Sequence, residues 1–232
     1  MIWPDKASAD AYKLVFENQK ILSGLKNILM IMILALPLNL LLTLLCGYFM
    51  ACHGMVWKRP ISLFIMFTMF FGGGLIPNYL NIRSLGLYNT IWALVIPGAL
   101  SVYNAIICKT AIEAIPESLQ EPAYLDGAQD FQILLRIIAP LIKPTLAVLV
   151  LYYGVSHWNS WYTATIYIRD EMKLPLQNIM RQLLMENESL ANSNSGDSYN
   201  VYAETIKYAA IVVSTGPILC IYPFLHECSC FF

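Results

Sequence analysis

Charged residues are scarce in this chain. The 232 residues include 14 Lys and Arg and 15 Asp and Glu, together 12%, whereas an average soluble protein carries about 25% charged residues. The hydrophobic share is 58%, and the mean hydropathy is +0.58. A net charge of −1 leaves no basic face for nucleic acid. The composition therefore excludes a soluble enzyme and a nucleic-acid-binding protein, and it indicates a membrane protein.

The few charges also leave long gaps between them. Five windows contain no charged residue: 27–57, 60–82, 84–108, 144–168 and 208–226. Each has roughly the 20 residues that a helix needs to cross a hydrocarbon core about 30 Å thick. Strands of a barrel would instead show segments of about ten residues that alternate in hydropathy. We expect an all-α membrane protein with a single domain over 1–232 and spanning helices near 28–52, 61–80, 89–109, 145–168 and 206–225.

Signals for metal, phosphate and proton chemistry are missing as well. The three histidines are scattered, and Cys228 and Cys230 lack a second cysteine pair, so we expect no metal site. No Lys-Ser or Lys-Thr follows the glycines at 72–74, so they predict close helix packing rather than a phosphate loop. No charge lies inside an apolar window, which argues against a proton relay. We therefore expect no catalysis, no bound cofactor and an energy source outside this chain.

The segment 110–143 is too polar to span a membrane but is rich in helix-forming residues. Pro116 suits a first helical position, and Gly127 interrupts the helix that follows it. Apolar residues resume after Gly127 and predict a second helix that ends at about Pro140. We expect two short helices at the membrane surface, an arrangement suited to meeting a partner.

One motif lies within that segment. Residues 121–140 read EPAYLDGAQDFQILLRIIAP, which resembles the cytoplasmic loop motif of ABC importer membrane subunits: E-A-A, three residues, G, nine residues, I, one residue, L-P. The positions that match in type and spacing are Glu121, Ala123, Gly127, Ile137 and Pro140. Pro122 and Ala139 depart from the motif, and neither change removes the glycine of the turn.

The resemblance extends over about 12–224, and it favours the carbohydrate branch of these importers, which is related to the inner-membrane subunits of the maltose importer. Segments such as FTMFFGGGLIPNYLNIRSLGLYNT and HWNSWYTATIYIRD carry it. It implies the transmembrane domain of a type I ABC importer. The family has six spanning helices, and we expect five here, because the chain begins where the family's first extracellular connection would be.

The resemblance also implies a function and a set of partners. The chain would be a permease subunit that moves an oligosaccharide across a bacterial cytoplasmic membrane. Its partners would be a second, homologous permease subunit, two cytoplasmic ATPase subunits that use ATP and Mg, an extracellular solute-binding lipoprotein, membrane lipid and the sugar. Loop 110–143 would be cytoplasmic and would couple the ATPase to the membrane helices. Loop 167–204 would be extracellular and would receive the binding protein, with a helix in its first half and an irregular second half from about 185.

The resemblance gives the loop residues their expected roles. Glu121 and Asp126 would offer carboxylates to donors on the ATPase, and Gly127 would permit the turn. Ala123 and Ala128 would keep the helix face low for close approach of the partner. Ile137 and Pro140 would complete the motif in the second helix. The alternative for the two acidic residues is that they are solvated and serve only as helix caps.

Aromatic rings and amides are the groups that recognise sugars, and the window 144–168 is dense in both. Its candidates for a sugar pathway are Tyr153, Trp158, Asn159, Trp161 and Tyr162, and a smaller polar spot contributes Tyr103 and Asn104. Because Trp158 and Tyr162 are four residues apart, we expect them on one helix face. The alternatives are an aromatic belt at the membrane interface and polar contacts that join helices.

Two other functions stay open from the sequence. The first is an ABC permease of the same architecture for a different solute, such as a peptide or an amino acid. The second is a membrane carrier or scaffold that needs no ATPase. Absence of intramembrane charge and of an internal repeat counts against a carrier.

Overall fold

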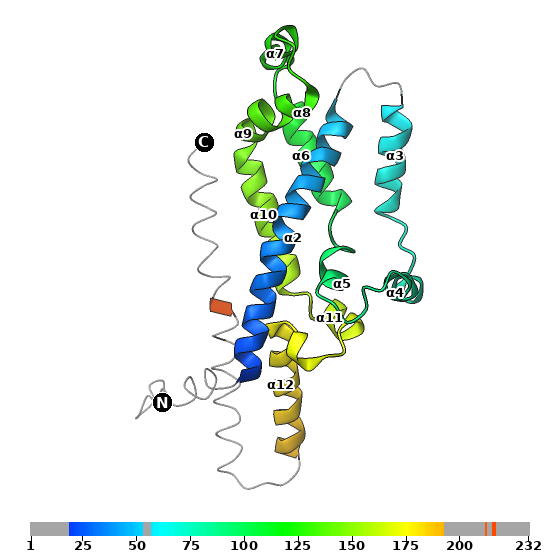
Figure 1. Cartoon of the computed structure of the whole chain (residues 1–232), viewed down its shortest axis with the longest axis vertical. Coiled ribbons are helices and arrows are strands. Elements are labelled where there is room, and N and C mark those ends of the chain that lie inside the picture. The colour runs from blue at the N-terminus through cyan, green and yellow to red at the C-terminus, as the bar shows by residue number, and fades with distance from the viewer. Residues whose placement is uncertain (1–18, 53–56, 193–211, 213–214, 217–232) are drawn as a thin grey trace, which may run out of the picture.

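The computed structural model describes residues 19–52, 57–192, 212 and 215–216. Within these ranges every regular element is helical and no strand occurs, as the hydropathy pattern predicts. Figure 1 shows the longest helices running along the long axis of the molecule, with short helical pieces at one end and across the middle. The expected helix over 206–225 lies outside the described ranges, apart from residues 212 and 215–216.

The central element is α2, Gln19–Ala51, which has 33 residues and is therefore about 50 Å long. In the described part of the chain it is the one unbroken helix that is long and apolar enough to cross a membrane. It is already helical at Gln19, nine residues before the expected start at 28, and its first described turns pack against a later segment of the chain. There Asn27 Nδ2 donates to the backbone oxygens of Met172, at 2.7 Å, and Leu174, at 3.2 Å.

Three helices pack along α2: α6, Val102–Glu113; α10, Lys143–Trp158; and α12, Leu176–Asn192. Glycines in α2 allow two of these approaches. A Cβ added at Gly47 would lie 2.9 Å from Cys108 Cβ of α6, and one at Gly24 would lie 3.1 Å from the Leu176 backbone of α12. Small residues of this kind let membrane helices approach closely. Two apolar clusters result, one at each half of α2.

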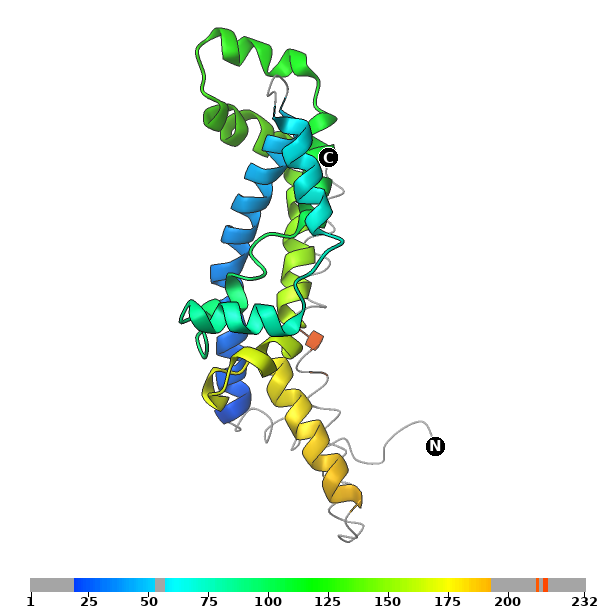
Figure 2. The same ribbon diagram turned by 90° about the vertical axis from the view of Figure 1, so that its right-hand side faces the viewer.

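The expected helix over 61–80 is broken. The structure has α3, Lys58–Thr68, and α4, Leu75–Ser84, and Figure 2 shows α4 lying crosswise to α3. The glycines at 72–74 cause the break, because Gly74 adopts φ +84°, which side chains disfavour. We expected these glycines to serve close helix packing, but within the described chain no atom comes closer than 3.9 Å to a Cβ built at any of the three, so they make no close helix contact there.

The expected helix over 89–109 is also broken. It consists of α5, Trp92–Val95, and α6, with an irregular linker over 96–101 between them. Pro97 lacks a backbone N–H and Gly98 follows it, so the helix does not continue. Ser101 then caps α6, because its Oγ accepts from the Asn104 backbone N at 3.4 Å.

The expected helix over 145–168 divides into α10 and α11, Trp161–Tyr167. Side chains at the break satisfy the last carbonyls of α10. Asn159 Nδ2 donates to the Val155 oxygen at 3.1 Å, and Ser160 Oγ donates to the His157 oxygen at 2.7 Å. Such side-chain bonds compete with continuation of the helix. As a result Trp158 and Tyr162 do not share a helix face, contrary to our expectation.

Asn89 ties two connecting segments together. It is the only non-glycine residue with positive φ in the described ranges, at 61°. Its Oδ1 accepts from the backbone N of Arg169, at 3.1 Å, and of Asp170, at 3.0 Å, while its own N donates to the Tyr167 oxygen at 2.9 Å. The segment after α4 is thereby held against the end of α11, and the short 3-10 turn η3, Glu171–Lys173, leads from there to α12.

The segment 110–143 forms a hairpin of short helical pieces beyond the end of α6 (Figure 1). Its first arm has a 3-10 turn, η1, Glu117–Leu119, and α7, Glu121–Leu125. Gly127 makes the turn with φ +79°. The second arm has α8, Asp130–Ile133; the π turn η2, Leu134–Ile138; and α9, Ala139–Leu141.

The second arm ends at Leu141, one residue after Pro140, which agrees with the expected end at about Pro140. The wide π turn before it lets the helical path continue to Leu141, and the proline occupies an early position of α9, where its missing N–H is tolerated. The axis then bends by 86° into α10.

Beyond α11, the expectation of irregular structure from 185 is wrong for 185–192, since α12 continues to Asn192.

Candidate functional site

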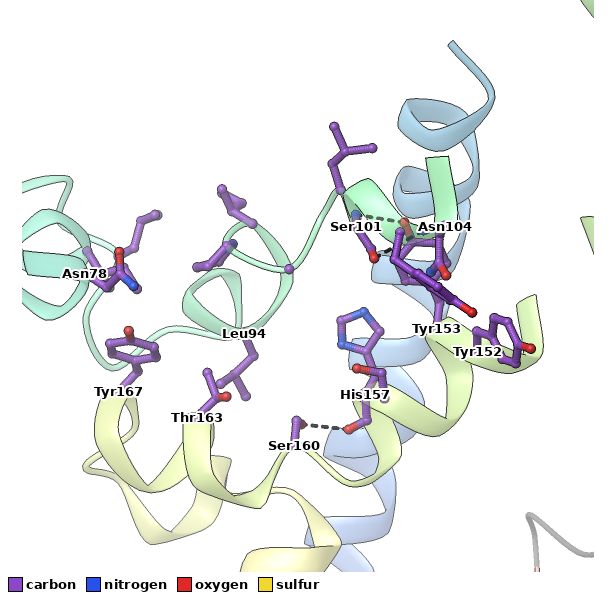
Figure 3. Close-up of a pocket in the computed structure, with 18 of the residues that line it drawn as sticks. Asn78, Leu94, Ser101, Asn104, Tyr152, Tyr153, His157, Ser160, Thr163 and Tyr167 are labelled. Atoms are coloured by element: carbon purple, nitrogen blue, oxygen red, sulfur yellow. Dashed lines mark hydrogen bonds between the residues drawn. The ribbon is translucent and has the colours of Figure 1, made fainter. Parts of the chain in front are cut away.

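A cavity of about 1000 Å³ lies where the broken helices meet (Figure 3). Its walls come from α4, the linker 96–101, the start of α6, and the α10–α11 break. Among the described residues that line it there is no Asp, Glu, Lys or Arg. Its polar side chains are Asn78, Asn81, Ser101, Tyr103, Asn104, Tyr152, Tyr153, Ser156, His157, Ser160, Thr163 and Tyr167. The helix breaks that hydropathy hides therefore create an uncharged cavity rich in amides, hydroxyls and aromatic rings.

Tyr153 joins three segments at the wall of this cavity. Its hydroxyl lies 2.7 Å from Thr43 Oγ1 of α2 and accepts from the Ser101 backbone N at 3.0 Å. Thr43 is fully buried and Tyr153 is nearly so. Because the Ser101 N–H takes the Tyr153 oxygen as acceptor, the linker 96–101 is held at a fixed position against α2 and α10.

His157 lies one turn further along α10, and its ring borders the same cavity (Figure 3). Its Nε2 lies 3.0 Å from Asn39 Nδ2, which belongs to α2 and is fully buried. Asn39 Oδ1 has no hydrogen-bond partner among the described residues. These two side chains are 118 positions apart, and no local pattern predicts that they meet.

The structure brings together three of the seven predicted pathway residues. Tyr103, Asn104 and Tyr153 all line the cavity, and the Tyr103 ring is 54% exposed. The aromatic wall also includes Tyr152 and Tyr167, which the prediction did not contain. Both residues lie in the aromatic-rich window 144–168, and this is the sequence feature that could have identified them.

The other four predicted residues lie away from the cavity lining. Trp158 is buried in the apolar cluster at the first half of α2, and Asn159 caps α10. Trp161 has the Arg181 guanidinium 3.7 Å from its ring centroid, and Tyr162 packs edge-on to it with centroids 5.6 Å apart. Their role in a pathway stays a prediction.

The hairpin 110–143 presents the motif residues in two directions. Gly127 is exposed, and a Cβ built there meets no atom within 4 Å. Glu121, Asp126 and Pro140 are exposed as well. Leu125 is 89% exposed, so an apolar side chain also faces outward beside the turn.

The other motif residues face the molecule itself. Ala123, Ala128 and Ile137 pack against the apolar cluster formed by α2, α6 and the second arm of the hairpin. The Ala128 N donates to the Ala123 oxygen at 2.9 Å across the Gly127 turn. The two alanines therefore pack partly against this chain's own core, and Glu121, Leu125 and Asp126 are exposed beside them. The role of the alanines in close approach of a partner stays a prediction.

A cluster of three oxygens connects the hairpin to α2. The Tyr124 hydroxyl donates to Asp130 Oδ1 at 2.9 Å, and the Tyr48 hydroxyl lies 3.2 Å from that of Tyr124 and 3.3 Å from Asp130 Oδ1. The bond with Tyr48 lowers the pKa of Tyr124, but burial and the Asp130 carboxylate outweigh it and keep this pKa above its ordinary value. Tyr124 therefore stays a neutral donor that ties both arms of the hairpin to the end of α2.

Metal ligands do not converge in the described ranges, where no three His, Cys, Asp or Glu side chains could hold an ion together. The absence of a metal site over the whole chain stays a prediction.

Known proteins resemble this chain along nearly its full length. The polygalacturonan/rhamnogalacturonan transport system permease protein YtcP of Bacillus subtilis is 34% identical over 226 residues, which cover 97% of this chain and 79% of that protein. Protein LplC of Bacillus subtilis is 36% identical over 227 residues, which cover 97% of this chain and 77% of that protein.

A solved structure agrees with these relatives. It is a bacterial ABC transporter involved in the import of the acidic polysaccharide alginate, and one of its chains matches with a TM-score of 0.86 and 28% identity over 97% of this chain and 80% of that chain. The fold is accordingly that of a type I ABC importer transmembrane domain.

Residues 16–226 match the family described as the inner membrane component of binding-protein-dependent transport systems. This match covers the helices that form the cavity, the hairpin with the Gly127 turn, and the segments that pack on α2. The chain therefore belongs to the family of inner membrane components of binding-protein-dependent transport systems.

Proposed function

We propose that this chain is a permease subunit of an ATP-driven importer and that its cargo is a carbohydrate, most simply an oligosaccharide. The observation that carries the proposal is the cavity of about 1000 Å³, whose described lining offers amides, hydroxyls and tyrosine rings and no charged carboxylate or amine. Sugar hydroxyls pair with the first two groups, and sugar C–H faces stack on the rings. The names of similar permeases, which include polygalacturonan and alginate transporters, support the same cargo class.

The partners follow from the same proposal. A second, homologous permease subunit would complete the pathway, and an extracellular solute-binding lipoprotein would deliver the sugar. Two ATPase subunits on the cytoplasmic side would bind and hydrolyse ATP with Mg. This chain itself would hold no cofactor, perform no catalysis and cross the bacterial cytoplasmic membrane several times, surrounded by lipid, with the hairpin 110–143 in the cytoplasm.

Movement would pass from the ATPase to the cavity through the hairpin. The exposed residues at the turn would contact the ATPase, while Tyr124 and Asp130 hold the hairpin to α2. The second arm of the hairpin leads directly into α10, which carries Tyr153 and His157. Closure of the ATPase dimer would thus displace the cavity wall, provided that sugar and ATP bind the two conformations with different affinity.

Cargo of another class has less support from the cavity. A free amino acid or a peptide carries an ammonium group, which is bound most effectively by a carboxylate. No described lining residue is Asp or Glu. A carrier that works without an ATPase has no support from the family match.

The proposal is tested by replacing the glycine of the turn and measuring which proteins accompany the chain. Gly127→Asp adds a charged side chain on the exposed face without contact to this chain, so the ATPase should no longer co-purify from native membranes in mild detergent. Gly86→Asp is the matched control, because Gly86 also has positive φ, at 68°, and open space around it.

The expected result is that both variants insert in the membrane, that Gly86→Asp retains an ATPase and a second permease, and that Gly127→Asp loses the ATPase together with sugar uptake. Normal uptake by Gly127→Asp, or an unaltered chain that purifies without any ATPase, would contradict the proposal.

A further inference from the structure

The wall of the cavity opposite α10 is a single short helix. α4 contributes Asn78, Asn81 and Ile82 to the lining, and Figure 3 shows Asn78 across the cavity from Tyr152 and Asn104. Those two residues belong to α10 and α6, which both pack on α2. One side of the cavity is therefore part of the main helix bundle, and the other side depends on how α4 is held.

The segment that leads into α4 gives this helix no support. A Cβ added at any of the glycines 72–74 would lie no closer than 3.9 Å to another atom, and the nearest atoms belong to Pro77 and Asn78 of α4 itself. Three consecutive glycines restrict the backbone little. In the first turn of α4, Ile76 is 70% exposed. The start of α4 is therefore joined to α3 by a segment that can change its course at little cost.

The other end of α4 leads to a fixed point. Gly86 follows the helix with φ +68°, and an added Cβ there would meet no atom within 4 Å, so no described neighbour restricts this turn. Asn89 comes three residues later and forms hydrogen bonds with the backbone of 167–170, and Lys173 Nζ donates to its backbone oxygen at 3.3 Å. α4 therefore lies between a flexible segment and an anchored one, with glycine at each junction.

Apolar contacts alone hold α4 against the cavity within the described chain. No hydrogen bond or ion pair between described residues joins it to another helix. Ile82 is buried in a small cluster with Ala93 and Tyr167, and the Tyr79 ring stacks on that of Tyr167 with centroids 6.4 Å apart. By contrast, two contacts between polar side chains join α10 to α2. Elements with few buried contacts are those that open most readily, so α4 is the part of the cavity wall best suited to move.

The polar side of α4 moves with it. Asn78 and Asn81 line the cavity, and their side-chain amides form no hydrogen bond with any described residue. They are three positions apart and therefore share a helix face. Each amide can both donate and accept, as a sugar hydroxyl can. A rotation of α4 would change the distance of both amides from the opposite wall.

We propose that α4 is a lid of the cavity, which turns between the glycines 72–74 and Gly86 and thereby brings Asn78 and Asn81 against the cargo or away from it. The stacked pair of Tyr79 and Tyr167 is the latch that holds the lid in its present position. Hinges that let a lid enclose a bound molecule are often small residues. This inference rests on the proposed function and adds a movement that the bundle of α2, α6 and α10 does not share.

The test measures the position of α4 in the whole transporter, reconstituted in lipid without cargo. Pulsed electron spin resonance gives the distribution of distances between two spin labels. The test pair joins Ile33 of α2 to Ile76 of α4, and the control pair joins Ile33 to Leu63 of α3. These side chains are 72%, 70% and 65% exposed, so labels fit at all three positions. Labels carried by non-natural amino acids leave the native cysteines unlabelled.

We expect two distances for the test pair and one for the control pair. Tyr79→Ala removes the ring of the latch and should raise the population of the second distance about two- to tenfold, as loss of one aromatic pair predicts. Tyr79→Phe is the matched control, because it keeps the ring and the Tyr79 hydroxyl forms no hydrogen bond with a described residue. Its distances should equal those of the unaltered transporter.

Uptake tests the two amides. The binding protein is loaded with a galacturonan trisaccharide, since a similar permease is named for polygalacturonan transport. Replacing Asn78 and Asn81 together by alanine should lower the initial rate of ATP-dependent uptake about tenfold, because two hydrogen bonds between neutral groups are lost. Arg83→Gln is the control, since Arg83 is exposed on the same helix and does not line the cavity.

A single test-pair distance that is the same in Tyr79→Ala would overturn the inference. An equal change in the control pair would overturn it as well, because α3 and α4 would then move as one body. Normal uptake by the double alanine variant would remove the amides from the cargo site. All these results leave the importer proposal standing. Absence of uptake in the unaltered transporter would instead count against the proposed cargo, while the distances still decide whether α4 moves.

Discussion

At the scale of single residues, Tyr153 has the clearest structural task. Its hydroxyl forms hydrogen bonds with Thr43 of α2 and with the Ser101 N–H of the linker 96–101 at the same time. Tyr153→Phe would remove the hydroxyl and leave a buried Thr43 hydroxyl and a backbone N–H without this partner. We expect the free energy of unfolding to fall by about 1–3 kcal/mol, because buried polar groups that lose their partners keep their desolvation cost.

Thermal unfolding of the transporter in detergent measures this loss. Tyr152→Phe is the control, since Tyr152 is its exposed neighbour on the same helix and the described chain gives its hydroxyl no hydrogen bond. Equal melting temperatures for the two variants would mean that the Tyr153 hydroxyl does not hold the linker.

At the scale of helices, the contact between α2 and α6 depends on the missing side chain of Gly47. An added Cβ would lie 2.9 Å from both Cβ and Sγ of Cys108 and 3.1 Å from the Lys109 N. Neither a Cβ nor a backbone nitrogen moves freely, so Gly47→Ala must separate the helices. We expect a cost of about 1–3 kcal/mol in the free energy of unfolding, as for other overpacked cores.

Gly154→Ala provides the comparison for that prediction. The nearest atom to its added Cβ is the flexible Met32 Cε, at 3.6 Å, which is an ordinary contact distance. Denaturant or thermal unfolding should therefore leave Gly154→Ala close to the unaltered protein and weaken Gly47→Ala. If both alanine variants were equally stable, α2 and α6 would not be in close contact at Gly47.

Helix breaks explain how much of this structure the sequence could predict. The all-helical class and the Gly127 turn follow from hydropathy and spacing, because both are local signals. Breaks at the glycines 72–74, at Pro97 and at Ser160 lie inside charge-free windows. The hydropathy of such a window is the same whether its helix is continuous or broken. The three expected helices over 61–80, 89–109 and 145–168 are consequently each divided into shorter pieces in the structure.

The cavity was harder to predict than the helices for a related reason. Tyr103, Asn104 and Tyr153 were found because they are polar or aromatic residues in apolar windows. The position of the His157 side chain depends on its contact with Asn39. The position of Tyr124 depends on its hydrogen bonds with Tyr48 and Asp130. Those contacts join distant parts of the chain, and local patterns in a single sequence cannot predict them.

At the scale of the whole molecule, the hairpin 110–143 and the cavity are connected through continuous structure. The hairpin packs on the second half of α2 and leads through the 86° bend into α10. The cavity is bordered by α10 and held to α2 by Tyr153 and His157. Under the proposed function, a displacement of the hairpin would reach the cavity wall through these two helices.

The central claim is that the chain moves sugar with energy from a separate ATPase, and reconstituted uptake tests it most directly. Proteoliposomes containing the chain with its second permease and ATPase subunits would be supplied with a binding protein loaded with labelled oligosaccharide. The importer assignment predicts accumulation of the sugar with ATP and none with a non-hydrolysable analogue. Equal accumulation with the analogue, or uptake without any ATPase subunit, would contradict the assignment.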